Sequence, residues 1–147
     1  MEQAGQIDPI KDLKKTFQDK ILEFFEKSET RYYILIKPED LLEFVDHIFN
    51  KLKARYQIIS AMDTPKGIEI IYHFAFDKFG KVVSFRTILP HENTEIESIA
   101  PIITGAQWIE REIAEIINVK FRNHPDPRKL ILADDWPKEV FPYRRNK

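Results

Sequence analysis

The chain has 147 residues, of which 43% are hydrophobic and 12% aromatic, so it can bury one sizeable core but hardly two. Its formal net charge of −1 gives no general attraction to nucleic acid or to an anionic membrane surface, and it contains no cysteine. These counts argue against nucleic-acid binding, and they exclude disulfides, thiolate catalysis and Cys-ligated zinc or iron–sulfur sites within the chain.

The N-terminal part is predicted to form a helix, a strand and a second helix. Asp8 can cap a helix that has Pro9 at its first position, and apolar residues then recur at three- and four-residue steps, which predicts a helix from about Asp8 to Lys27. A short apolar and aromatic run predicts a strand over Tyr32 to Ile36, and helical spacing returns over Leu41 to Leu52. The apolar positions of the first helix are Ile10, Leu13, Phe17, Ile21 and Phe24.

Three strands are predicted between Tyr56 and Leu89, where the hydrophobic period changes to two. Turn-forming sequences at residues 63–67 and 77–81 divide this segment, so the strands should form a meander. The predicted fold class is α+β: an antiparallel sheet, made of the meander and the N-terminal strand, covered by helices.

A further helix is predicted from Gly105 to Asn118, because isoleucines form an apolar stripe along it. Its charged residues are most simply interpreted as a solvated face with weak ion pairs, for example between Arg111 and Glu115, four positions apart. These charged residues are Glu110, Arg111, Glu112 and Glu115.

The C-terminal part, from Lys120 onward, is predicted to be an extended basic arm attached to an α+β domain of residues 1–119. The domain has 15 basic and 20 acidic residues, whereas the arm has 8 basic and 4 acidic ones. The arm holds four of the nine prolines and no glycine, which favours a stiff, extended chain. It is too apolar for a disordered tail, so we expect it to pack on its own domain or on a neighbour.

Several short motifs around this junction resemble the signature of the NADH-quinone oxidoreductase C-subunit family. They are Trp108-Ile109-Glu110-Arg111-Glu112, Val119-x-Phe121, His124-Pro125-Asp126, Arg128-Lys129-Leu130 and Asp134-Asp135-Trp136. That family supplies a hydrophilic subunit of respiratory complex I and has relatives in energy-converting, membrane-bound nickel–iron hydrogenases and ferredoxin-linked complexes. The resemblance implies an α+β scaffold subunit without a cofactor of its own, which clasps a large hydrogenase-like catalytic subunit beside iron–sulfur subunits.

The departures from that signature favour a hydrogenase-type relative. The tyrosine and Phe-Gly that follow Glu-Arg-Glu in the quinone-reducing form are absent from residues 113–119, Asn123 replaces the glycine before His-Pro, and Pro127 replaces a leucine. The C-subunit of a quinone-reducing NADH dehydrogenase complex remains the alternative. No apolar run approaches the roughly 20 residues that span a bilayer. The resemblance implies a peripheral location on the cytoplasmic side of the cell membrane, with membrane contact through partner subunits.

Partner binding, with no catalytic, cofactor or metal site, is the role expected for the signature residues. Arginine guanidinium groups bind carboxylates in bidentate fashion, and tryptophan supplies apolar anchors at interfaces. His124 lacks the His or Cys companions that a metal site needs. The candidates are Trp108, Glu110, Arg111, Glu112, His124, Pro125, Asp126, Arg128, Lys129, Trp136, Arg144 and Arg145. Two other classes stay open: a free-standing small enzyme that uses Asp134, Asp135 and His124, and a soluble adaptor unrelated to redox complexes.

Overall fold

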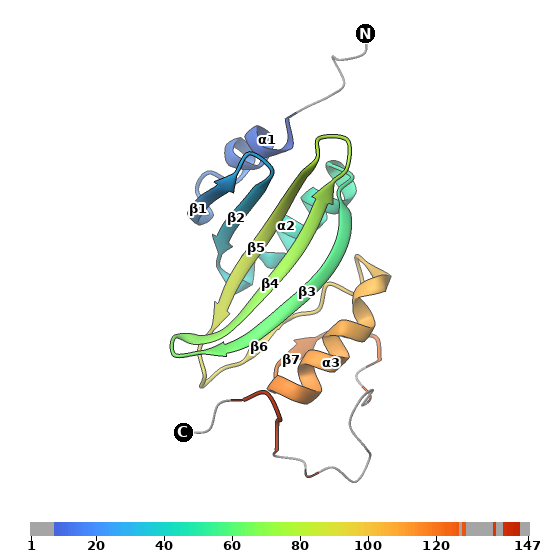
Figure 1. Ribbon diagram of the computed structural model, residues 1–147. Helices are drawn as coiled ribbons and strands as arrows, with labels where there is room; N and C mark the ends of the chain where they lie inside the picture. Colours follow the sequence, from blue (N-terminus) through green and yellow to red (C-terminus); the bar gives the residue numbers. More distant parts are fainter. Residues whose placement is uncertain (1–7, 127, 129–136, 138–139, 145–147) are drawn as a thin grey trace.

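The computed structural model describes residues 8–126, 128, 137 and 140–144 (Figure 1). Short helical turns also occur at Pro38–Asp40, His47–Lys51 and Thr104–Ala106. The main elements of these residues are, in chain order, α1 (Pro9–Thr16), β1 (Ile21–Ser28), β2 (Arg31–Ile36), α2 (Leu41–Asp46), β3 (Arg55–Thr64), β4 (Gly67–Phe76), β5 (Lys81–Leu89), β6 (Glu95–Glu97), α3 (Gln107–Ile117) and β7 (Lys120–Arg122).

The larger sheet has the strand order β1-β2-β5-β4-β3 and is mostly antiparallel, as predicted. The pair β2–β5 is parallel, which the sequence did not indicate. The helices α1 and α2 pack together on one face of this sheet, where the rings of Phe17 and Phe44 stack at 4.0 Å between centroids (Figure 1). The strands β6 and β7 form a separate two-stranded parallel sheet that lies with α3 near β3.

The predicted helix from Asp8 to Lys27 is wrong beyond Thr16, because residues 21–28 form the edge strand β1. The helix begins as expected, with the Asp8 side chain accepting a hydrogen bond from the N–H of Ile10 at 3.0 Å. The pairing of β1 with β2 is irregular between Ile21 and Glu23, and a bulge of this kind shifts which side chains share a face. Ile21 and Phe24 therefore share a face of the strand although they are three positions apart, and a spacing of three is also typical of a helix.

The meander is confirmed, because β3, β4 and β5 pair antiparallel in sequence order. The first turn requires glycine at position 67: its φ is +146°, and an added Cβ atom would lie 2.3 Å from the carbonyl oxygen of Leu89. The second expected helix is also present, as α2 and the turn that follows it. The alternating apolar residues of β4 form the centre of the core, and these are Ile68, Ile70, Tyr72, Phe74 and Phe76.

The expected boundary between domain and arm, after Val119, falls immediately before β7. β7 pairs with β6 through Ile96 and Phe121, and the Phe121 side chain belongs to the hydrophobic core. No helix within the described residues is long and apolar enough to cross a membrane.

Candidate functional site

The signature residues are brought together by a helix, a reversal and a strand. The helix α3 turns the side chains of Glu110, Ile113 and Ile117 toward the core at three- and four-residue steps. Asn118 ends the helix because it adopts the left-handed conformation, with φ 66° and ψ 60°. The chain then enters β7, which places the residues after Phe121 beside the first turns of α3.

Glu110 is fully buried, so the prediction from the sequence that it belongs to a solvated helix face is wrong. One carboxylate oxygen accepts a hydrogen bond from Ser98 Oγ at 2.5 Å, and the other accepts one from the N–H of Ile99 at 2.9 Å. Burial raises the pKa of Glu110 to about 7, and these two hydrogen bonds act in the opposite direction. The carboxyl group of Glu110 therefore binds the loop that precedes α3 and does not contact solvent.

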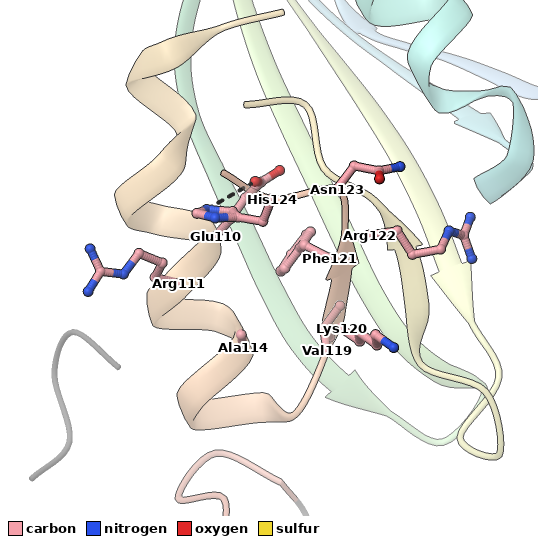
Figure 2. A pocket seen from close by; sticks show the side chains of 9 residues that line it. All are labelled: Glu110, Arg111, Ala114, Val119, Lys120, Phe121, Arg122, Asn123 and His124. Atoms are coloured by element: carbon pink, nitrogen blue, oxygen red, sulfur yellow. Dashed lines mark ion pairs between the residues drawn. The ribbon is translucent and has the colours of Figure 1, made fainter. Parts of the chain in front are cut away.

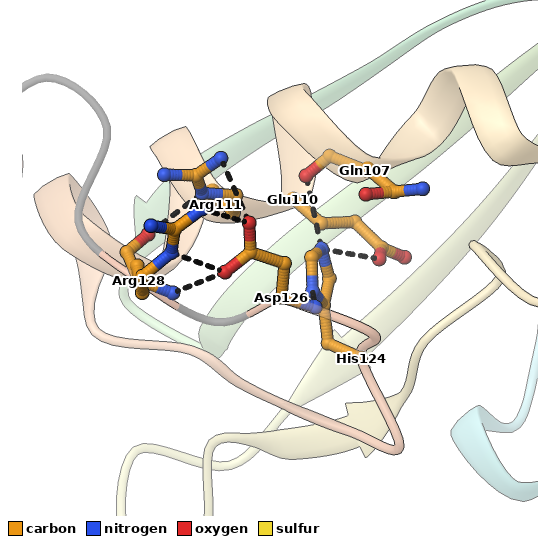
Figure 3. A network of polar contacts seen from close by, with 6 residues as sticks. All are labelled: Gln107, Glu110, Arg111, His124, Asp126 and Arg128. Atoms are coloured by element: carbon orange, nitrogen blue, oxygen red, sulfur yellow. Dashed lines mark hydrogen bonds and ion pairs between the residues drawn. The ribbon is translucent and has the colours of Figure 1, made fainter.

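His124 joins the end of β7 to the start of α3 (Figure 3). Its Nε2 lies 2.9 Å from the carbonyl oxygen of Gln107, and its Nδ1 accepts the N–H of Asp126 at 2.9 Å. This pattern assigns the proton to Nε2, since Nδ1 is the acceptor. Nε2 also lies 3.7 Å from Oε1 of Glu110. Both ring nitrogens are therefore engaged within the chain, which leaves His124 without a free ligand atom.

The carboxylate of Asp126 lies near two arginines, Arg111 and Arg128, at the surface end of this cluster (Figure 3). Arg128 binds this carboxylate through Nε and a terminal nitrogen, each at 2.8 Å. The Arg128 guanidinium holds the pKa of Asp126 well below its usual range. Arg111 lies 3.7 Å from the same carboxylate and donates from Nε to the carbonyl oxygen of Arg128 at 2.7 Å. Arg111 thus supports the bend after β7.

Arg144 lies at the opposite, C-terminal end of α3. Its Nε donates to the carbonyl oxygen of Ile117 at 2.6 Å, and a terminal nitrogen lies 3.4 Å from Thr94 Oγ1. The adjacent N–H of Tyr143 donates to the carbonyl oxygen of Ile116 at 2.9 Å. A cation here satisfies carbonyl groups that a helix end leaves without partners and complements the helix dipole. This part of the predicted arm therefore packs on its own domain.

The other predicted site residues differ in exposure. Trp108 is 67% exposed on the outer side of α3, and the side chain of Arg128 is 80% exposed despite its bond to Asp126. Pro125 is exposed and Glu112 is partly buried. The predicted positions Lys129, Trp136 and Arg145 lie outside the described residues, as do Asp134 and Asp135.

A pocket of about 350 Å³ lies between α3 and β7 (Figure 2). Sequence reasoning missed Lys120 and Arg122, which flank Phe121 on β7 and reach the pocket; the alternation of charged and apolar residues at 120–122 is the signal for such a strand. It also missed Ser98, whose role depends on a contact with a helix 12 residues away. Within the described part of the chain, no group of three or more His, Asp or Glu side chains is placed to hold a metal ion. The pocket is lined by Glu110, Arg111, Ala114 and residues 119–124.

Sequence comparisons relate the chain to subunits of respiratory and hydrogenase-related enzymes. Residues 34–147 match the family described as respiratory-chain NADH dehydrogenase, 30 kDa subunit. The chain is 30% identical over 135 residues to the C-subunit of F420H2 dehydrogenase from Methanosarcina mazei, covering 87% of this chain and 85% of that protein. It is 28% identical to NADH-ubiquinone oxidoreductase subunit 9 of Prototheca wickerhamii, covering 82% of this chain and 63% of that protein. It is 25% identical to formate hydrogenlyase subunit 5 of Escherichia coli, covering 91% of this chain but 24% of that protein.

Solved structures with the same fold confirm the predicted α+β class. A chain of the membrane-bound sulfane sulfur reductase, described as an archaeal respiratory membrane complex, aligns with a TM-score of 0.78 at 18% identity, covering 92% of this chain and 81% of that one. The trypsin-resistant fragment of Nqo5 aligns with a TM-score of 0.68 at 15% identity, covering 80% of this chain and 96% of the fragment.

Proposed function

The chain belongs to the respiratory-chain NADH dehydrogenase 30 kDa subunit family, and we propose that it is a non-catalytic scaffold subunit of a membrane-associated, complex-I-like oxidoreductase. The proposed assembly is an energy-converting hydrogenase or a ferredoxin-oxidising complex. In it, this chain docks on a large subunit of the nickel–iron-hydrogenase type, beside iron–sulfur subunits. It is a peripheral subunit on the cytoplasmic side of the membrane and carries no cofactor of its own.

The strongest support is the similarity to formate hydrogenlyase subunit 5 of E. coli. Nearly the whole of this chain, 91%, aligns with 24% of that protein. The counterpart of this chain is there joined covalently to a much longer polypeptide. In that protein, the region similar to this chain therefore shares a polypeptide with a much larger remainder, which supports the proposal that this chain docks on a large partner of that kind.

The geometry of the site also supports a structural role, in which its polar contacts fix the conformation of a binding surface. The polar side chains of Glu110, His124 and Asp126 are engaged by groups of the same chain, at the distances given above. Enzyme sites instead direct such groups at a bound substrate. Trp108, which is large, apolar and exposed, is typical of an anchor at a protein interface.

The alternative within the same family is the C-subunit of a quinone-reducing NADH dehydrogenase complex. The similarity to subunit 9 of the Prototheca enzyme supports it. The departures from the quinone-reducing signature at residues 113–119 and at Asn123 favour the hydrogenase-type assembly. The two assemblies differ in their other subunits, so the identity of the co-purifying chains distinguishes them.

The test is purification of the intact assembly. Native membranes would be solubilised gently, the chain recovered through an affinity tag, and the co-eluting subunits and metals identified by mass spectrometry and metal analysis. We expect a large hydrogenase-like subunit and iron–sulfur subunits, with nickel where the assembly is a hydrogenase. Recovery of the chain alone from the soluble fraction contradicts the scaffold function and favours an adaptor, whereas catalytic activity or bound metal in the isolated chain favours a small enzyme.

A further inference from the structure

The strand β7 has one edge paired with β6 and one edge without a strand among the described residues. The N–H of Lys120 donates to the carbonyl oxygen of Thr94, and the carbonyl oxygen of Arg122 accepts the N–H of Ser98, each at 2.9 Å. Successive residues of a strand direct their backbone groups to opposite edges. The N–H and carbonyl groups of Phe121 therefore point away from β6, to an edge that is a template for an additional strand.

This open edge borders the pocket between β7 and α3 (Figure 2). The apolar side chains of Ala114, Val119 and Phe121 line the pocket, and its volume of about 350 Å³ is near the lower end for specific binding sites. A space of this size takes a few residues of extended chain, but it is too small for a helix. The combination of unpaired backbone groups and apolar side-chain space is the geometry by which sheets bind extended peptides.

Two cations of β7, Lys120 and Arg122, lie beside the pocket, and they pair with two carboxylates of β6, Glu95 and Glu97. The Lys120 side chain is 77% exposed, and it lies 4.0 Å from the carboxylate of Glu95. Arg122 pairs with Glu97 at 2.7 Å, which leaves Lys120 as the more available cation. Glu95 and Glu97 balance these two cations in charge, whereas Glu110, the one carboxylate among the lining residues, is fully buried under its hydrogen bonds. The 4.0 Å contact between Lys120 and Glu95 is longer than a hydrogen bond, so the exposed ammonium group of Lys120 can bind a carboxylate of a partner.

We propose that an extended acidic segment of a partner subunit binds along the open edge of β7, pairing with the backbone of Phe121 and placing a carboxylate near Lys120. The segment lies in the groove beside Ala114 of α3. This inference rests on the proposed scaffold function and adds to it the surface and the chemistry of one contact. Binding of a second copy of this chain, or of a small anion, at this edge would contradict the proposal.

The first test measures amide hydrogen exchange in the complete complex and in the isolated chain. We expect the amide of Phe121 to exchange more slowly by roughly tenfold or more in the complex, because it donates a hydrogen bond to the added strand. Replacement of Ala114 by leucine fills the groove, whereas Ala114→Ser leaves it open. Ala114→Leu should abolish the protection of Phe121 and reduce the recovery of the partner, while Ala114→Ser should behave as wild type.

The second test identifies the occupant. A photoreactive amino acid placed at position 120 in the assembled complex should cross-link to an acidic, extended segment of another subunit, and the same residue at the exposed position 66 should not. A cross-link to a second copy of this chain, to a helix or to a basic segment overturns the inference. Unchanged exchange at Phe121 in wild-type complex also overturns it, even if Ala114→Leu fails to fold. Co-purification of subunits in these cases leaves the scaffold function intact, whereas recovery of the chain alone contradicts both proposals.

Discussion

The carboxylate of Glu110 lies 3.7 Å from Nε2 of His124, with 0% and 3% of the two side chains exposed. Glu110 binds the loop before α3 through Ser98, and His124 binds the first turn of α3 through Gln107. The pair therefore connects three segments that are distant in sequence: the loop after β6, the helix α3 and the turn after β7. Disturbing either side chain should affect the position of all three.

Glu110 should make the stability of the fold depend on pH. Its pKa is raised from the usual 4.5 to about 7 by burial, so the folded chain keeps this proton over a range in which the unfolded chain loses it. The contribution of Glu110 is most favourable below its unfolded pKa, decreases as pH rises from 4.5 to about 7, and is constant above that. At 1.36 kcal/mol per pKa unit, the decrease is about 3 kcal/mol.

The Glu110→Gln variant isolates this effect, because glutamine does not titrate. Urea unfolding of both proteins between about pH 4 and pH 8 gives the free energy of unfolding at each pH. We expect the wild type to lose about 3 kcal/mol relative to the variant across this range. Parallel pH profiles would show that Glu110 does not retain its proton in the folded state.

Replacement of His124 by alanine should destabilise the isolated chain by about 2 kcal/mol, because the N–H of Asp126 and the carbonyl oxygen of Gln107 both lose their partner in a partly buried site. Chemical unfolding at neutral pH measures this loss. A change below about 0.5 kcal/mol, the usual range for a surface substitution, would mean that water replaces the imidazole without loss.

The strands of the meander could be predicted because large apolar side chains face the core at every second position of β4, although residues of the opposite face such as Glu69 and Ser84 are also buried. The strand β1 could not, because its bulge places Ile21 and Phe24 on one face at a helical spacing. The parallel pairing of β2 with β5 depends on how distant segments are ordered in the sheet, which local periodicity does not encode.

In the site, Glu110 lies three and seven positions before Ile113 and Ile117 on the apolar stripe of α3, but its charge led to the wrong prediction of a solvated position. The role of His124 was not readable, because its partner is the backbone carbonyl of Gln107, 17 residues away. Backbone acceptors carry no residue-specific signal. The same limit applies to Arg144, whose partners at the end of α3 are mainly carbonyl groups.

Replacement of Arg144 by alanine should reduce stability by about 1 kcal/mol, since α3 loses a cation and hydrogen-bond donors at its C-terminal end. Arg144→Lys keeps the charge but not the planar guanidinium, and it should retain part of this contribution. Urea unfolding of the three proteins measures the difference. Equal stability of the alanine variant and the wild type would mean that the contact with Ile117 does not form in solution.

Replacement of Trp108 by alanine should separate assembly from folding. Because this side chain is 67% exposed, the isolated variant should unfold within about 0.5 kcal/mol of the wild type. If Trp108 is an interface anchor, association with the partner subunit should weaken by about 2 kcal/mol or more, measured as co-purification at several concentrations. Ile113→Ala, at a buried position of the same helix, is the contrasting control and should destabilise the isolated chain itself. Unchanged assembly of the Trp108 variant would remove this residue from the interface.

Two truncations test where the folded domain ends. A chain ending at Val119 loses β7 and with it the Phe121 side chain, which is 8% exposed in the core; removing a buried phenylalanine side chain alone costs about 3–5 kcal/mol. We expect this chain to be largely unfolded by circular dichroism and urea titration. A chain ending at Asp126 keeps the pairing of β7 with β6 and the contact of His124 with Gln107, so it should fold with reduced stability, since it lacks Arg144. If the chain ending at Val119 instead unfolds at the same urea concentration as the full chain, β7 belongs to the arm, and its pairing with β6 contributes little to the stability of the domain.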